Sequence, residues 1–138
     1  MKGLDTNVLL RYLAADDPEQ TPIVVDLFAT AERRNERLHV STVVLCEVIW
    51  SLRSAYDMRR DGIVTVLENL LASSLFDLQD RELVRRALES YREGPADFSD
   101  YLLGLHDRKA GCSETFTFDR NLRGAAGFHY LGVKRDTA

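Results

Sequence analysis

The stretch that decides the fold is the start of the chain, where residues 1–13 read MKGLDTNVLLRYL. Met1 to Leu4 is typical of a short buried strand, and Asn7 to Ala14 is predicted to be a helix because apolar residues recur on one side of it. Asp5 stands between them. A carboxylate in that position can cap the helix or bind a metal ion, and the rest of the sequence bears on that choice.

Short apolar strands alternate with helices along the rest of the chain. Further strands are predicted at 38–40, 75–78, 115–118 and 129–133, and further helices at 16–34, 41–56, 59–73, 80–93 and 97–110. This alternation predicts an α/β domain with a mainly parallel sheet. The length of 138 residues predicts a single domain that spans 1–138.

The composition is that of an ordinary globular protein, with 45% hydrophobic and 29% charged residues. No apolar run reaches the ~20 residues of a membrane helix, and no signal-peptide pattern is present. We therefore expect a cytoplasmic protein with no membrane partner.

Cys46 and Cys112 lie in apolar contexts without C-x-x-C spacing, which predicts buried, reduced thiols. The three histidines form no zinc-binding pattern.

The net charge of −4 argues against nucleic-acid binding when it is taken alone, because nucleic-acid-binding proteins usually have a basic balance. The objection weakens if several acids gather around bound cations, since these reverse the local sign of charge. Several arginines form clusters, as at 33–37, 59–60 and 85–86. Such clusters form solvated helix faces, or in a minority of cases line a track for a phosphate backbone.

Two aspartates directly follow predicted strands. Asp5 follows the first strand, and Asp119 follows the TFTF strand at 115–118. Ligands of an open parallel sheet bind beyond the carboxyl ends of its strands, so both carboxylates are expected at one crevice. Taken singly, each is also a common turn or cap residue.

Glu47 lies on the predicted helix 41–56, beside its apolar face, where Trp50 is a neighbour. A glutamate is almost never fully buried unless it is paired. Three interpretations are open. The carboxylate points toward the edge of the sheet, reaches water while its stem packs, or pairs with an arginine such as Arg53.

Asp97 and Asp100 begin the predicted helix 97–110. Asp97 is the natural cap by position, which leaves the Asp100 side chain free to point away from the helix start.

Three or four carboxylates in one crevice would repel each other and raise their pKa values unless a cation sat among them. Oxygen ligands without Cys or His suit Mg²⁺ or Mn²⁺. Two such ions roughly 3.5–4 Å apart suit phosphodiester hydrolysis.

Four segments resemble, in order, those of the PIN-domain ribonucleases, and in particular the VapC-like toxins of bacterial toxin–antitoxin pairs. These segments are LDTNVLLRYL at 4–13, STVVLCEVIW at 41–50, ADFSDYLLGLHDRKAGC at 96–112 and TFTFDRNL at 115–122. The resemblance covers nearly the whole chain. It implies a three-layer fold in which helices flank a mainly parallel, short-stranded sheet.

The resemblance also implies a set of site residues. Four acids would bind one or two Mg²⁺ or Mn²⁺ ions and serve catalysis: Asp5, Glu47, Asp100 and Asp119. Polar neighbours would support them, namely Thr6, Asn7 and Thr117, and Asp97 is the alternative to Asp100 as the third acid.

The activity implied by the resemblance is metal-dependent endonucleolytic cleavage of RNA by a homodimer that a cognate antitoxin blocks. The apolar helix pair 41–56 and 59–73 would supply dimer surface, or packs as ordinary core. Two other functions stay open. An aspartate-nucleophile phosphatase would want D-x-D, where this chain has Asn7, and a receiver-like or catalytically idle PIN-like module would use its acids only as caps.

Overall fold

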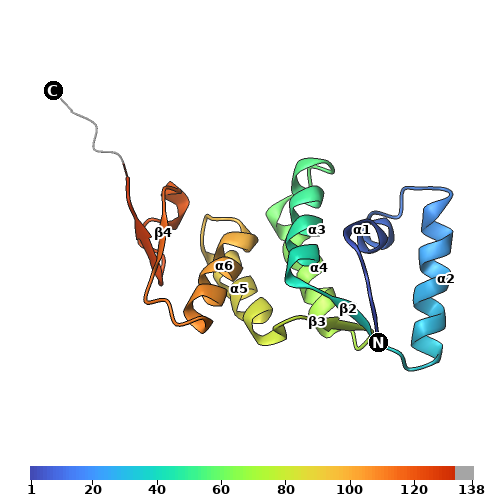
Figure 1. Ribbon diagram of the computed structural model, residues 1–138. Helices are drawn as coiled ribbons and strands as arrows, with labels where there is room; N and C mark the ends of the chain where they lie inside the picture. Colours follow the sequence, from blue (N-terminus) through green and yellow to red (C-terminus); the bar gives the residue numbers. More distant parts are fainter. Residues whose placement is uncertain (133–138) are drawn as a thin grey trace. The chain divides into compact units, whose positions relative to one another are not determined.

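The computed structural model of the protein describes residues 1–132 and is shown in Figure 1. The chain divides into two compact units. Unit 1 is Met1–Val84, and unit 2 begins at Arg85. Helix α5 (Arg81–Glu93) starts in unit 1 and continues in unit 2. That residues 1–138 form a single domain stays a prediction.

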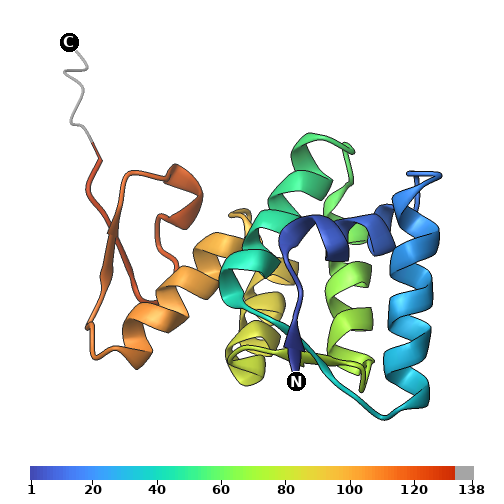
Figure 2. The same cartoon turned by 45° about the vertical axis from the view of Figure 1, so that its right-hand side comes forward.

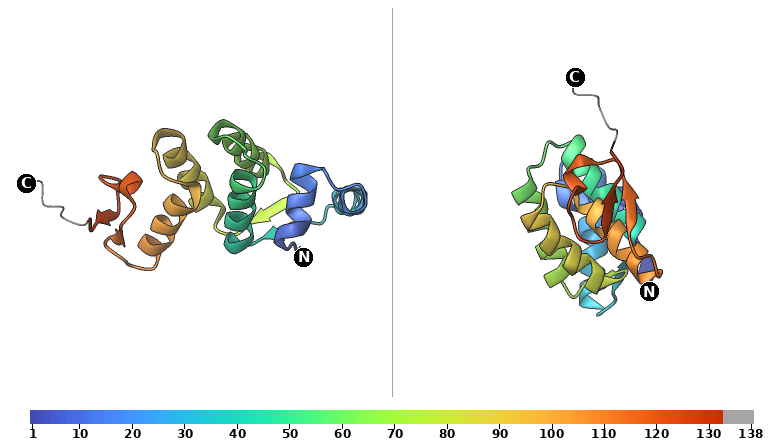
Figure 3. Two further views of the ribbon diagram at one scale, coloured as in Figure 1. Left: turned by 90° about the horizontal axis from the view of Figure 1, so that it is seen from above. Right: turned by 90° about the vertical axis from the view of Figure 1, so that its left-hand side faces the viewer.

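Unit 1 contains a three-stranded parallel sheet in the order β1-β2-β3 and four helices. The strands are β1 (Lys2–Gly3), β2 (Leu38–Val40) and β3 (Phe76–Leu78). The helices are α1 (Thr6–Ala14), α2 (Gln20–Arg33), α3 (Thr42–Ser54) and α4 (Arg60–Ala72). Helix α1 packs against both α2 and α3 and lies between them, as Figures 2 and 3 show.

The two faces of this sheet differ because side chains alternate along a strand. Leu38 and Val40 of β2 are buried, as are their β3 partners Phe76 and Leu78. His39 has the opposite orientation, and its Nδ1 lies 2.7 Å from Oδ2 of its register partner Asp77. The His39 ring is the main reason that the pKa of Asp77 lies below its ordinary value.

Unit 2 contains helix α6 (Phe98–Lys109) and a two-stranded parallel sheet of β4 (Thr115–Thr117) and β5 (Phe128–Tyr130). A short 3₁₀ helix, η1 (Arg120–Leu122), follows β4. The predicted α/β fold with parallel strands and flanking helices is thus confirmed, although its strands belong to two sheets. The last predicted strand extended to Val133, which lies outside the described residues.

The predicted start of the second helix was wrong by several residues. Helix α2 begins at Gln20. The Asp17 carboxylate accepts hydrogen bonds from the backbone N–H groups of Glu19 (2.9 Å) and Gln20 (2.7 Å), and the Asp17 carbonyl accepts one from Thr21 (3.0 Å), so Asp17 and Pro18 form a capping turn that leads into the helix. The two bonds to the carboxylate also lower the pKa of Asp17.

The cysteines are less buried than expected. Cys46 on α3 is half-buried, and Cys112 is exposed in the segment that follows α6, so the prediction of two buried thiols was wrong. Neither cysteine forms a disulfide within residues 1–132. None of the helices within residues 1–132 combines the length and the apolar composition that crossing a lipid bilayer requires.

Gly104 provides a test of packing in unit 2. A Cβ added to this α6 residue would lie 2.6 Å from Cζ of Phe128 on β5. Overpacking costs roughly 1–3 kcal/mol, and the higher helix propensity of alanine returns about 1 kcal/mol. We therefore expect Gly104→Ala to lower the free energy of unfolding by up to about 2 kcal/mol, measured by urea denaturation.

Gly62→Ala is the matched control, because Gly62 is also helical and its added Cβ would meet the flexible side chain of Met58. We expect a smaller loss for this variant. Equal stability losses in the two variants would contradict a rigid contact between α6 and β5.

Candidate functional site

Asp5 follows β1 and caps α1. Its Oδ1 accepts a hydrogen bond of 3.1 Å from the backbone N–H of Val8, and its own backbone is extended, as at most N-caps. Within residues 1–132, no hydrogen bond or ion pair engages Oδ2. Since a carboxylate accepts through both oxygens, capping leaves Asp5 able to bind a cation as well.

Glu47 is brought to the start of α1 by a contact that the sequence did not predict. The hydroxyl of Thr6 donates a hydrogen bond of 2.7 Å to Oε2 of Glu47, which links α1 to α3 across 41 positions of the chain. Glu47 is exposed, and its described partner is Thr6 rather than Arg53. Because Thr6 directly follows Asp5, unit 1 holds both predicted acids at the same end of α1.

A cavity of about 300 Å³ lies beside Asp5 in unit 1. Asn7 lines it together with Asp5, and so does Arg11, whose Nε donates a hydrogen bond of 2.7 Å to the Gln20 side chain. Of the two supporting residues predicted next to the first acid, Asn7 therefore faces an open space in which a ligand can be accommodated, whereas Thr6 is not part of its lining.

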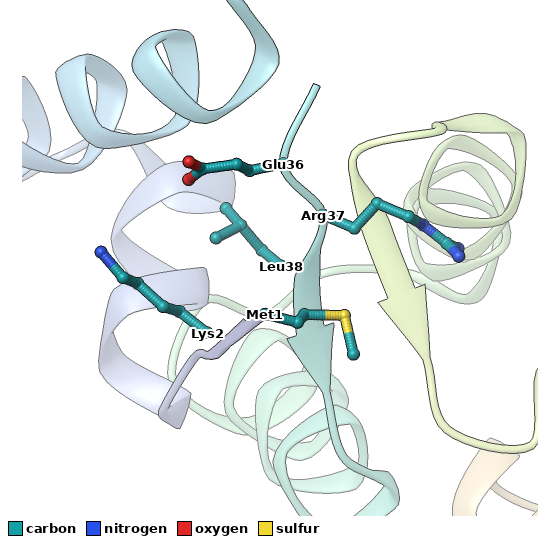
Figure 4. A pocket seen from close by; sticks show the side chains of 5 residues that line it. All are labelled: Met1, Lys2, Glu36, Arg37 and Leu38. Atoms are coloured by element: carbon teal, nitrogen blue, oxygen red, sulfur yellow. The ribbon is translucent and has the colours of Figure 1, made fainter. Parts of the chain in front are cut away.

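A second cavity of unit 1, of about 430 Å³, lies where β1 and β2 begin (Figure 4). Lys2 and Glu36 extend to one side of β2, and Arg37 extends toward β3, where it donates a hydrogen bond of 3.3 Å to the carbonyl of Phe76. This cavity contains none of the predicted site residues. It lies at the amino ends of the strands, whereas ligands of parallel sheets usually bind at the carboxyl ends.

Unit 2 contains the other three candidate acids, Asp97, Asp100 and Asp119. Their negative charges affect one another. Asp97 occupies the N-cap position of α6 as expected, but its side chain makes no capping hydrogen bond. Asp100, in the first turn, is half-buried. Burial raises the pKa of Asp100, and the negative charges of Asp119 and Asp97 raise it further.

Asp119 repeats at the end of β4 the arrangement of Asp5 at the end of β1. Its Oδ1 accepts a hydrogen bond of 2.9 Å from the backbone N–H of Asn121 and so caps η1. Its own backbone N–H donates to the Thr117 hydroxyl at 3.0 Å. Thr117 is therefore next to the fourth acid, as predicted, and helps to hold the turn.

The donor set suits a hard divalent cation. Within the part of the chain that the structure describes, no ion pair with Lys, Arg or His neutralises any of the five candidate acids. The raised pKa of Asp100 shows that negative charge accumulates in unit 2. The acids therefore fit the ion in type and charge. The structure does not bring them together into a complete site, because no group of three or more His, Cys, Asp or Glu among residues 1–132 is close enough to hold a metal ion.

Comparison with known proteins points to one family. A family model described as PIN domain matches residues 3–127, a range that includes all the predicted acids. The chain is also 29% identical over 123 residues to a VapC ribonuclease of Aquifex aeolicus (strain VF5). This similarity covers 89% of the chain and 90% of the relative.

The raised pKa of Asp100 predicts how stability depends on pH. A carboxyl whose pKa is higher in the folded than in the unfolded state costs stability once it ionises. This cost develops as the pH rises from the ordinary value of 3.8 through the raised folded value. Without metal, we therefore expect Asp100→Asn to melt at a higher temperature than the wild type at pH 7, with a smaller difference at pH 3.5.

Thermal unfolding in EDTA at both pH values measures this effect. Asp26→Asn is the control, because it removes one negative charge from an exposed position on α2. A lower melting temperature for Asp100→Asn at pH 7 would show that Asp100 makes a favourable interaction when it is charged.

Proposed function

The chain belongs to the PIN domain family, and from that premise we propose that it is an endoribonuclease toxin that requires Mg²⁺ or Mn²⁺ and is neutralised by a cognate antitoxin. The observation that carries the proposal is the set of strand-end and helix-start carboxylates that have no basic partner among residues 1–132. The similarity to a VapC ribonuclease supports the choice of RNA as substrate and of the cytoplasm as location.

In this proposal, Asp5, Glu47, Asp100 and Asp119 hold one or two divalent ions. Such ions supply Lewis-acid activation of water and stabilise the charge that develops on the leaving oxygen. The protein supplies oriented carboxylates. Thr6 fixes the Glu47 carboxylate, and the capping bonds of Asp5 and Asp119 fix one oxygen of each side chain while the other stays available. Supported ligands of this kind bind metals more tightly than mobile ones.

Asp97 keeps its place as the alternative third acid, because its uncapped carboxylate is close enough to affect the pKa of Asp100. We favour Asp100 as the ligand. It is half-buried, and a cation would offset the cost of ionising a carboxylate in that environment.

Two substitutions of Asp5 can separate its role as a helix cap from its proposed role as a metal ligand. Asparagine is as good an N-cap as aspartate, whereas alanine loses the cap at a cost of about 1 kcal/mol. We expect Asp5→Asn to keep the wild-type melting temperature but to lose about 100-fold or more in RNA cleavage rate, because a metal ligand contributes several kcal/mol. We expect Asp5→Ala to lose both stability and cleavage.

The assay is cleavage of a labelled structured-RNA pool in Mg²⁺ or Mn²⁺, with EDTA as the metal-free reaction. Mn²⁺ should raise the melting temperature of the wild type but not that of Asp5→Asn, because only the wild type has the full ligand set. Undiminished cleavage by Asp5→Asn would contradict the assignment. A folded wild type that neither cuts RNA nor responds to Mn²⁺ would instead be the idle PIN-like module.

By likeness to the family we also propose a homodimer. The apolar helix pair predicted from the sequence supports this less than expected, because Leu52, Ile63, Leu67 and Leu70 are buried. The support is now the side chains that α3 leaves exposed, Val43 at 67% and Trp50 at 71%.

Equilibrium sedimentation tests the assembly. We expect a dimer at tens of micromolar that shifts toward the monomer in Trp50→Glu, since a charge inside an apolar interface is costly.

Co-expression with a small protein encoded next to this gene tests the antitoxin, and it should yield a stable complex that does not cut RNA. A monomeric wild type, or free toxin after co-expression, would count against these partners.

A further inference from the structure

A cavity of about 390 Å³ in unit 2 is not used by the proposed metal centre. Its walls come from the end of α5 and the loop that follows, from α6, and from η1 with the next few residues. Three lining residues are chain neighbours of the candidate acids: Pro95 is two positions before Asp97, Tyr101 follows Asp100, and Arg120 follows Asp119. A ligand in this cavity would therefore lie near the acids of unit 2.

One wall of the cavity is rigid. Tyr101 is buried, and its hydroxyl accepts a hydrogen bond of 3.2 Å from the backbone N–H of Ala96. Gly94 packs against this ring so closely that a Cβ in its place would overlap the Tyr101 hydroxyl. A preformed wall lowers the entropy that a ligand loses when it binds.

The positive charges of the cavity lie on η1 and on the residue that follows it. Arg120 and Arg123 both line the cavity and are exposed, and neither forms an ion pair with a carboxylate within residues 1–132. The Arg123 guanidinium lies over the ring of Tyr130, 5.7 Å from its centroid, and this contact restrains its orientation. Glu93 is the carboxylate in the lining, and it disfavours an anion on its own side of the cavity.

We infer that this cavity binds one nucleotide of the RNA strand, with its phosphate held by Arg120 and Arg123. Guanidinium groups match phosphate geometry and also provide flat surfaces for unpaired bases. The cavity size lies within the usual range for small-ligand sites. The inference rests on the proposed function, because the neighbouring catalytic acids are what make an RNA strand the expected anion. The cavity would hold a nucleotide that flanks the cleaved bond and not the cleaved bond itself.

The salt dependence of RNA binding tests the inference directly. Each phosphate contact with a single strand adds about 0.7 to the slope of log affinity against log salt. For Arg120→Gln/Arg123→Gln, which loses the contact with one phosphate, we therefore expect affinity for a labelled single-stranded RNA to fall about tenfold at 50 mM KCl, and the slope to fall by about 0.7. Fluorescence anisotropy in EDTA between 50 and 200 mM KCl measures both.

Two further variants make the measurement specific. Arg33→Gln/Arg34→Gln removes the same charge from the exposed end of α2 in unit 1, and we expect it to bind within about twofold of the wild type. Arg120→Lys/Arg123→Lys keeps the charge but not the bidentate geometry, and we expect an intermediate affinity. In the Mn²⁺ cleavage assay, the glutamine variant should raise KM and leave kcat nearly unchanged, since the arginines bind the strand outside the reacting centre.

The outcomes separate this inference from the proposed function. If the wild type binds and cuts RNA while the Arg120→Gln/Arg123→Gln variant has the same affinity and salt slope, the subsite is wrong and the ribonuclease assignment stands. If the Arg33→Gln/Arg34→Gln control weakens binding equally, the loss of affinity reflects the overall charge of the protein, and the subsite is again wrong. If the wild type neither binds nor cuts RNA, the proposed function fails and the inference fails with it.

Discussion

The candidate site depends on one electrostatic constraint, which is that its carboxylates lie at strand ends and helix starts and have no basic partner in the part of the chain that the structure describes. Asp100 shows the cost, because burial and its acidic neighbours raise its pKa. A structural role alone gives no reason to gather such charges, since one cap requires only one acid. In the proposed function, a divalent cation would offset this repulsion. The same repulsion therefore links the stability of the metal-free protein to its proposed catalysis.

Asp5 and Asp119 show how one residue can serve both structure and chemistry. Each follows a parallel strand, and each uses one oxygen to accept a backbone N–H of the next helical turn. The cap fixes the side chain, and the second oxygen stays free for a ligand. Thr6 has a comparable effect on Glu47, because its hydrogen bond holds a carboxylate that would otherwise move in solvent. Local secondary structure thus orients the groups that the proposed reaction requires.

An acidic protein can bind RNA when its charges are distributed unevenly. The net charge of −4 is a property of the whole chain, whereas a phosphate interacts mainly with groups within about one Debye length. Arg120 and Arg123 lie beside candidate acids and have no carboxylate partner among residues 1–132. Acids that hold cations and arginines that hold phosphate would together form a surface that accepts an RNA strand, even though the overall charge is unfavourable.

The sequence by itself determined most of the helices and strands, because strand and helix periodicity and capping residues act over a few positions, and it named the candidate acids. The strand at 38–40 and the caps at Asp5 and Asp119 are examples. It placed the start of α2 too early, since Asp17 and Pro18 form a capping turn and regular helix begins only at Gln20. Only the tertiary structure decided the partner of Glu47 and the cavity walls around Arg120. These contacts join residues many positions apart, and a local pattern does not encode them.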